Sequence, residues 1–241
     1  MRPWHRAARA AIELYPRGLK LFWLAPAVLA LVVVPEFAQH VVEIRLGMFE
    51  SEEAFRALSN DPTRWAFGYA KIAGLVLAIL ASARFWWARE AGHRWYDVRR
   101  IAWGRLILGF LLFGLVPVAP ELAGRWIGEQ AVFWVSIALS LALLPMLFLM
   151  IAGLFGDRAT RLSSMWRSAW PWLVLTAVLA VSGFVPAAWL HQLNHRWAFG
   201  MEPALVWALM GLDSLLVGLL AGLTGTAFYL GYAAFAEGER R

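Results

Sequence analysis

One carboxylate, Asp213, lies about nine residues inside the last long apolar stretch, within the sequence ALVWALMGLDSLLVGLLAGLTGTAFYL. A charged side chain near the middle of a bilayer costs roughly 2.5–3.5 kcal/mol on insertion scales unless it is neutralised or paired. Such groups usually face the interior of a helix bundle and often mark ion or proton pathways. Asp213 is therefore the first candidate for transport, and the alternative is a neutral acid that hydrogen-bonds across a helix contact.

Three other residues are candidates to act with Asp213 in transport or in a helix contact. Lys71 lies a few residues into the second apolar stretch. Its side chain either reaches toward Asp213 or extends to the outer interface, and we favour the interface. Gly218 and Gly222 have the small-xxx-small spacing that lets another helix backbone approach closely.

Histidines and a glutamate occur in two pairs with four-residue spacing. Glu36 and His40 lie at the outer end of the first apolar stretch, and His191 and His195 follow the fifth. Each pair lies on one side of a helix at the outer face, and the ligand types suit zinc. The sequence HQLNH lacks the glutamate of the HExxH metalloprotease motif. Because histidines at an interface need no metal, we predict no metal site and no cofactor.

Other chemistry finds little support. The chain has no cysteine, which excludes disulfides and thiolate sites. It has no glycine-rich phosphate loop, no GxSxG elbow and no paired carboxylates at catalytic spacing. We therefore expect a protein that is not an enzyme.

Six apolar stretches must position these residues. The chain has 241 residues, of which 61% are hydrophobic, more than a soluble domain of this size can bury. A bilayer accepts runs of about 20 such residues as helices. The predicted spans are residues 19–37, 66–87, 106–123, 131–155, 170–190 and 204–235.

The sequence thus predicts an all-α integral membrane protein with one polytopic domain over residues 1–241. Residues 1–18 read as an amphipathic segment in the membrane interface. The first stretch is interpreted as a retained helix, with a signal peptide as the alternative. The third stretch is the shortest, so five spans and one re-entrant segment remain an alternative to six spans.

Basic residues indicate the orientation. Most lysines and arginines lie in the N-terminal segment, residues 88–105, residues 156–169 and the C-terminal tail. The positive-inside rule places these segments, and both termini, on the cytoplasmic side of the membrane, which we predict to be a bacterial inner (plasma) membrane. The net charge of +6 is explained in this way without a nucleic-acid partner.

One cytoplasmic connection, AREAGHRWYDVRRIAWGR, mixes aromatic residues with five arginines, of which four are candidates to bind lipid. Basic and aromatic residues beside a membrane suit anionic lipid headgroups, at about 1 kcal/mol per cation. Generic anchoring to the bilayer is the favoured interpretation, and specific binding of a lipid headgroup is the alternative. The four candidate residues are Arg89, Arg94, Arg99 and Arg100.

The long acidic outer connection contains its own local signals. Ser51 is a good N-cap for a short helix through Leu58. Asp61 followed by Pro62 forms an N-cap and first-turn pair for the second span.

Three of the predicted spans share a plan of basic entry, apolar run and proline near the outer end. Pro35, Pro117 and Pro186 would be equivalent positions. This pattern suggests three helical hairpins, although proline near an interface is common.

Two segments, RAARAAIELYPRGLKLFWL and RATRLSSMWRSAWPWLVL, each lead from a basic amphipathic sequence into a span. In this layout the chain resembles bacterial six-helix membrane families, namely the membrane domain beside glycerophosphodiester phosphodiesterases and the YciC-like proteins. The resemblance implies a membrane module with no established chemistry of its own.

Three functions follow as hypotheses. The first is an accessory or scaffold subunit that works through helix contacts with a membrane-protein partner or a second copy. The second is a small transporter or permease-like protein with Asp213 in its pathway. The third is a protein that binds lipids of the surrounding bilayer through its basic, aromatic connections.

Overall fold

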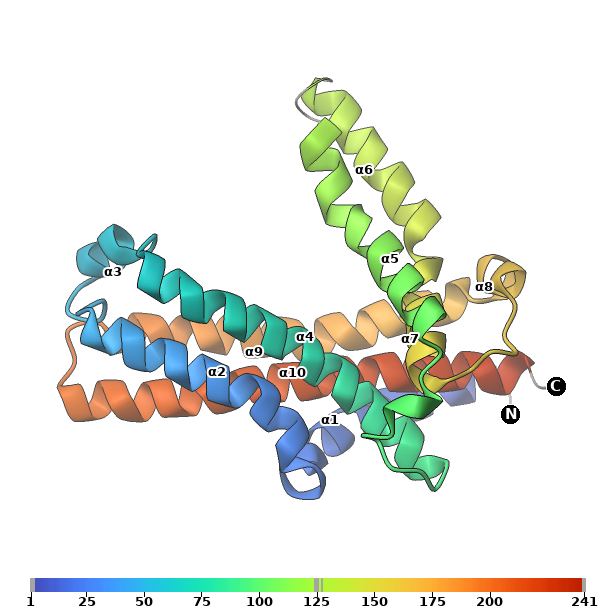
Figure 1. Ribbon diagram of the computed structural model, residues 1–241, viewed down its shortest axis with the longest axis horizontal. Helices are drawn as coiled ribbons and strands as arrows, with labels where there is room; N and C mark the ends of the chain where they lie inside the picture. The colour runs from blue at the N-terminus through green and yellow to red at the C-terminus, as the bar shows by residue number, and fades with distance from the viewer. Residues whose placement is uncertain (1–2, 124–125, 127, 240–241) are drawn as a thin grey trace. The chain divides into compact units, whose positions relative to one another are not determined.

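The computed structural model describes residues 3–123, 126 and 128–239, and over these residues the chain is helical without a strand (Figure 1). The elements in chain order are α1 (Pro3–Leu24), α2 (Pro26–Arg45), α3 (Glu52–Leu58), α4 (Pro62–Glu90), η1 (Val98–Arg100), α5 (Trp103–Ala123), α6 (Glu129–Leu143), α7 (Pro145–Phe155), α8 (Leu162–Ser168), α9 (Trp170–Ala198) and α10 (Pro203–Glu239).

Five helical segments in the described part are long and apolar enough to cross a membrane. They are Pro26–Arg45, Pro62–Glu90, Gln130–Phe155, Trp170–Ala198 and Pro203–Gly238. The apolar part of α5, Trp103–Leu115, is shorter. The prediction of an all-α protein with several helices long and apolar enough to span a membrane is confirmed over the described residues, whereas six spans stay a prediction.

The chain divides into two compact units, where the sequence suggested one domain. Unit 1 comprises residues 1–86 and 178–227, and unit 2 comprises residues 87–177 and 228–241. Each is described by itself below.

The first predicted span, residues 19–37, is interrupted. Helix α1 ends at Leu24, Ala25 has φ −149° and ψ 55°, and α2 begins at Pro26. Proline has no N–H to donate and disfavours helical backbone at the residue before it. The span is therefore α2, and the amphipathic segment extends to Leu24 rather than to residue 18.

Two helices of unit 1 continue beyond their apolar stretches. Helix α2 runs eight residues past the predicted end at residue 37, and α9 runs eight residues past residue 190. Both extensions were predicted as outer connections. They remain helical because their polar side chains are buried against other helices of the unit, as the next subsection shows.

The predicted caps of the outer connection are confirmed. The Ser51 hydroxyl accepts a hydrogen bond from the Ala54 backbone N–H at 3.0 Å, and α3 ends at Leu58. Asp61 Oδ1 accepts from the Thr63 and Arg64 N–H groups at 2.8 and 3.1 Å, at the start of α4. Helix α3 lies at the end of unit 1 where α2 and α4 are joined (Figure 1).

Glycines let the helices of unit 1 pack closely around a core of Val32, Ala78, Val217 and Ala221. A Cβ at Gly74 of α4 would meet the Leu31 carbonyl oxygen of α2. At Gly218 and Gly222 of α10 it would meet side chains of α1 and α2. The predicted small-xxx-small contact therefore forms inside the unit.

In unit 2, α5 and α7 approach at two glycines. A Cβ at Gly109 would meet the Met150 backbone, and one at Gly153 would meet the Leu106 backbone. The Gly153 carbonyl also accepts a hydrogen bond from the Ala102 N–H at 2.8 Å. Helices α5 and α6 form a hairpin (Figure 1).

The proposed equivalent prolines lie inside three helices. Pro35 is in α2 and Pro186 in α9. Pro117 falls in α5, where its side chain lies outside the described residues. The arrangement in three hairpins stays a prediction.

The connection after α7 is held by hydrogen bonds within unit 2. The Arg105 guanidinium donates to the carbonyl oxygens of Asp157, Arg158 and Thr160. The Asp157 carboxylate accepts from the Thr160 hydroxyl at 2.7 Å and from the Tyr232 hydroxyl at 2.8 Å. Burial opposes ionisation of Asp157, but these hydrogen bonds outweigh it and lower the pKa of its carboxyl.

We expect Gly225→Ala to destabilise unit 1 by about 1–3 kcal/mol, because the new methyl group would fall on the Ile79 carbonyl oxygen and force α4 and α10 apart. Thermal unfolding in detergent, followed by tryptophan fluorescence, measures the change. Gly211→Ala on the same helix is the matched control. Its Cβ meets nothing within 4 Å, so the better helix former should leave stability equal or slightly raised. Equal losses for both variants would contradict the close α4–α10 contact.

We expect Asp157 to make the stability of unit 2 depend on acid pH. Its pKa is lower in the folded state than in the unfolded one, so its stabilisation is present above about pH 4 and is lost as the pH falls through the folded-state value. Asp157→Asn should therefore be less stable than the wild type near neutral pH and should lose less stability on acidification. Unfolding temperatures measured at about pH 6 and about pH 3 test this. An identical acid sensitivity of the two proteins would contradict it.

Candidate functional site

Four helices of unit 1 bring polar side chains together in its interior. We call these ten residues the polar cluster. They are Glu36, Gln39, His40 and Glu43 of α2, Arg64 and Lys71 of α4, His191, Asn194 and His195 of α9, and Asp213 of α10.

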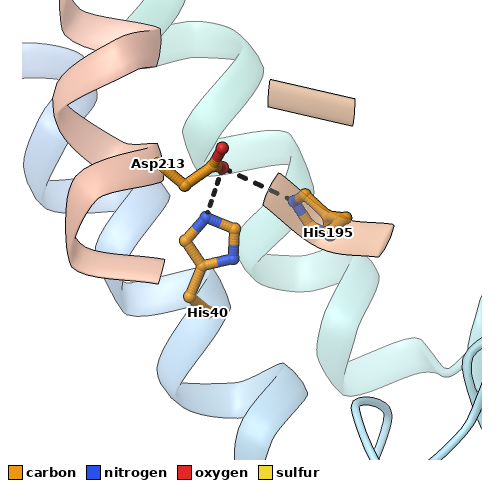
Figure 2. A group of neighbouring side chains, drawn as sticks. All are labelled: His40, His195 and Asp213. Carbon is orange, nitrogen blue, oxygen red and sulfur yellow. Dashed lines mark hydrogen bonds and ion pairs between the residues drawn. The ribbon is translucent and has the colours of Figure 1, made fainter. Parts of the chain in front are cut away.

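Asp213 is the centre of the polar cluster. Its Oδ2 lies 2.6 Å from His191 Nδ1, 3.0 Å from His40 Nε2 and 3.5 Å from His195 Nε2. Its Oδ1 accepts a hydrogen bond from the Asn194 amide at 3.4 Å. Figure 2 shows the His40 and His195 rings, which come from different helices, both directed at this carboxylate. One carboxylate oxygen thus faces three imidazole nitrogens.

His40 faces carboxylates with both of its ring nitrogens. Nδ1 lies 2.9 Å from Glu43 Oε2, and Nε2 lies 3.0 Å from Asp213 Oδ2 and 3.3 Å from Glu36 Oε1. A neutral imidazole carries one proton, so one nitrogen would face a carboxylate oxygen with its lone pair. Two acceptors at hydrogen-bond distance repel each other unless a further proton or a metal ion lies between them.

The two glutamates are each held by a cation of α4. Glu43 Oε1 accepts from Arg64 Nε at 2.9 Å and from the Gln39 amide at 2.7 Å. Glu36 Oε1 accepts from Lys71 Nζ at 3.3 Å. These ion pairs join α2 to α4 and fix the α2 carboxylates in front of His40.

The permanent charges of the polar cluster do not cancel. Three carboxylates, those of Glu36, Glu43 and Asp213, face the two cations Arg64 and Lys71. Burial of an uncompensated charge is costly, so the group favours one additional positive charge. A protonated histidine would supply this one charge, and a divalent metal ion would supply two.

The polar cluster has a buried interior and a more accessible edge. Asp213, Glu36, His40 and Glu43 are 0% exposed. The side chains of Lys71 and His191 are 24% and 26% exposed. The central carboxylate is therefore sealed by packing, while its neighbours on α4 and α9 reach the surface of the unit.

Two groups of these residues have metal-ligand geometry. In His40, His195 and Asp213, one ligand atom from each residue lies within 4.8 Å of the others, and the same holds for Glu36, His191 and Asp213. The four residues considered and set aside as zinc ligands in the sequence are thus brought together, with Asp213 as the residue shared by both groups.

The expected separation of these residues is corrected. Asp213 was predicted near the middle of the bilayer and the histidines in an outer connection. In the structure α9 continues to Ala198 and only residues 199–202 connect it to α10, so the two helices are antiparallel and His191 is level with Asp213. A turn predicted at residues 199–202 would have placed His191 and Asp213 at similar distances from it, and this was the signal in the sequence that could have paired them.

Lys71 has a different partner from either expectation. It contacts Glu36, rather than Asp213 or the outer interface alone. Sequence reasoning also missed several members of the polar cluster because they lie beyond the apolar stretches. The missed residues are Gln39, Glu43, Arg64 and Asn194.

The four arginines proposed for lipid headgroups lie in unit 2. Arg94, Arg99 and Arg100 line an open hollow of about 600 Å³ together with His93 and Tyr96. Asp97 lies in the same hollow and accepts from Arg100 Nε at 3.2 Å, which offsets part of the positive charge. Arg89 is exposed at the end of α4. Lipid binding here stays a prediction.

No protein-family model, curated protein or solved structure matches the chain. The layout resemblance to six-helix bacterial families stays a prediction.

We expect Lys71→Met to destabilise unit 1 by about 1–3 kcal/mol, because it leaves the buried Glu36 carboxylate without its cation. The double variant Lys71→Met with Glu36→Gln should recover most of this loss, since it removes both charges. The double variant Lys71→Met with Asp213→Asn tests Asp213 as the alternative partner of Lys71. It should recover less of the lost stability than the variant with Glu36→Gln. Unfolding in detergent measures all three. Greater recovery with Asp213→Asn would contradict the Lys71–Glu36 pair.

Proposed function

We propose that this protein is a small multi-pass membrane transporter that moves a cation past Asp213. The observation that carries the proposal is the single Asp213 oxygen within 3.5 Å of three histidine nitrogens, buried between helices long enough to span a membrane. Ionisable groups in such helices are costly and commonly mark ion pathways.

Charge and access both support a cation. The carboxylates of the polar cluster outnumber its permanent cations, so the cluster has an uncompensated negative charge that a cation would balance. His191 and Lys71 are partly exposed beside the buried Asp213 and provide polar groups on the way to it. A cation would exchange the water of its hydration shell for carboxylate and imidazole donors along this edge.

The proposed setting is the inner membrane of a bacterium with both termini in the cytoplasm, as the distribution of basic residues favours. In this orientation the connections after α2 and α9 face outward. The polar cluster then lies in the outer half of the membrane, and a cation would enter from that side.

The packing removes one of the grounds for the accessory or scaffold hypothesis. The hypothesis relied on three features: the glycine-lined last helix, the rich aromatic surface and the absence of catalytic motifs. Gly218 and Gly222 are instead packed against residues of α1 and α2 in the same unit. The sealed position of Asp213 is compatible with a scaffold, and purification of the native complex in mild detergent remains the test for a stoichiometric partner.

The transport proposal is tested by flux in liposomes that contain the purified protein. Entry of Zn²⁺, Mn²⁺ and protons is followed with encapsulated fluorescent indicators. We expect Asp213→Asn to lower the rate for the transported cation about tenfold or more, because the central negative charge is lost.

Ser214→Ala is the matched control on the same helix. The Ser214 hydroxyl is buried but donates only within α10, to the Met210 carbonyl at 2.9 Å, so its loss should leave the flux unchanged. A wild-type protein that carries none of these cations, or an Asp213→Asn variant as fast as Ser214→Ala, would overturn the proposal.

A further inference from the structure

We propose that the polar cluster binds one divalent transition-metal ion of the Zn²⁺ class. The ligands are His40 Nε2, His195 Nε2 and Asp213 Oδ2. We assign the fourth position to the carboxylate of Glu36, whose Oε1 lies 3.3 Å from His40 Nε2. The inference rests on the proposed function in one respect, since it names the chemical class of the cation handled there.

The distances from Asp213 Oδ2 to the His40 and His195 nitrogens fit a tetrahedral ion. With metal–ligand bonds of 2.0–2.1 Å, two donors of a tetrahedron lie about 3.3 Å apart. His40 Nε2 is 3.0 Å from Asp213 Oδ2. It is 3.3 Å from Glu36 Oε1, which also contacts Lys71, so Oε2 of the same carboxylate is the oxygen left for the ion. His195 Nε2 is 3.5 Å from the same Asp213 oxygen.

Donors without partners point to the same ion. Among the described residues, neither ring nitrogen of His195 has a hydrogen-bond partner, although both are buried. Glu36 is 0% exposed and its Oε2 also has no partner, while its Oε1 contacts Lys71. Buried polar atoms are nearly always satisfied, so an ion bonded to His195 Nε2 and Glu36 Oε2 accounts for two of these three atoms, and His195 Nδ1 stays without a hydrogen-bond partner.

The surroundings of His40 match those of a metal-bound histidine. Such a histidine usually donates its second ring N–H to a carboxylate, which fixes the tautomer and the ring orientation. Glu43 accepts from His40 Nδ1 at 2.9 Å and is itself held by Arg64 and Gln39. With the proton on Nδ1, His40 Nε2 presents a lone pair to the site. A lone pair binds a metal ion, whereas it repels a neighbouring carboxylate oxygen.

The donor types select the class of metal. Two imidazole nitrogens favour Zn²⁺ and its neighbours over Mg²⁺ and Ca²⁺, which prefer oxygen alone. The chain has no cysteine, so soft thiolate chemistry is absent. His191 approaches Asp213 at 2.6 Å, too close for two ligands of one ion, and acts as a hydrogen-bond partner that orients the carboxylate.

Metal binding is measured on the full-length protein in detergent, after removal of metal with a chelator and reloading with ZnCl₂. Metal content by mass spectrometry should give one Zn²⁺ per chain. Titration calorimetry should show that His195→Gln weakens binding more than about 100-fold and that Glu43→Gln weakens it about 10–100-fold. His93→Gln, which changes a histidine of unit 2, should bind Zn²⁺ as the wild type does.

Replacement of Zn²⁺ by Co²⁺ provides a readout of the ligands that does not depend on the folding of a variant. The wild-type protein should give the intense visible absorption of a tetrahedral Co²⁺ site with nitrogen and oxygen donors. A folded wild-type protein without stoichiometric metal, an octahedral Co²⁺ spectrum, or undiminished binding by folded His195→Gln would overturn the inference.

The two proposals fail separately. Stoichiometric Zn²⁺ binding with no cation flux supports the metal site and removes the transport function. Proton flux by a protein that binds no Zn²⁺ removes the metal site and leaves the transport function.

Discussion

The Asp213 carboxylate is buried without exposure among four helices, and its charge must be balanced where it lies. The residues that do so come from separate parts of the chain, with His40 on α2 and His191 and His195 on α9. A buried charge is costly when its partners are removed, so these contacts hold the helices in one register. Apolar packing brings the helices of unit 1 together, and these polar contacts specify which residues face one another.

Close packing makes the interaction possible. Small residues allow the backbones of α2, α4 and α10 to approach, as at Gly74 and Gly225. The approach brings short side chains such as Asp213 within reach of histidines on the neighbouring helices. Interhelical contacts in membranes rely on packing and polar bonds, because lipid provides little hydrophobic drive for one helix to join another. In this unit the glycines therefore set the distance between helix backbones, and the polar residues set the register of neighbouring helices.

The composition of the polar cluster gives it a chemical role as well as a structural one. A purely structural ion pair needs one partner for each charge, whereas here His40 faces three carboxylates and both His195 nitrogens have no hydrogen-bond partner among the described residues. A cation site requires atoms with free lone pairs, and the carboxylates and the unpartnered imidazole nitrogens provide them. Partial exposure at His191 and Lys71 connects that site to the surface of the unit.

Local signals determined much of this protein from its sequence alone. The apolar runs specify membrane helices because a bilayer demands internal hydrogen bonding over a fixed length, and Ser51 and Asp61 cap helices through contacts with residues two or three positions away. The hydropathy pattern predicted that two helices end at residues 37 and 190, although these helices continue to Arg45 and Ala198. Only the tertiary structure decided that these polar turns face one another, because their burial depends on partners distant in the sequence. The same contacts decided that the histidine pairs and Asp213 form one site.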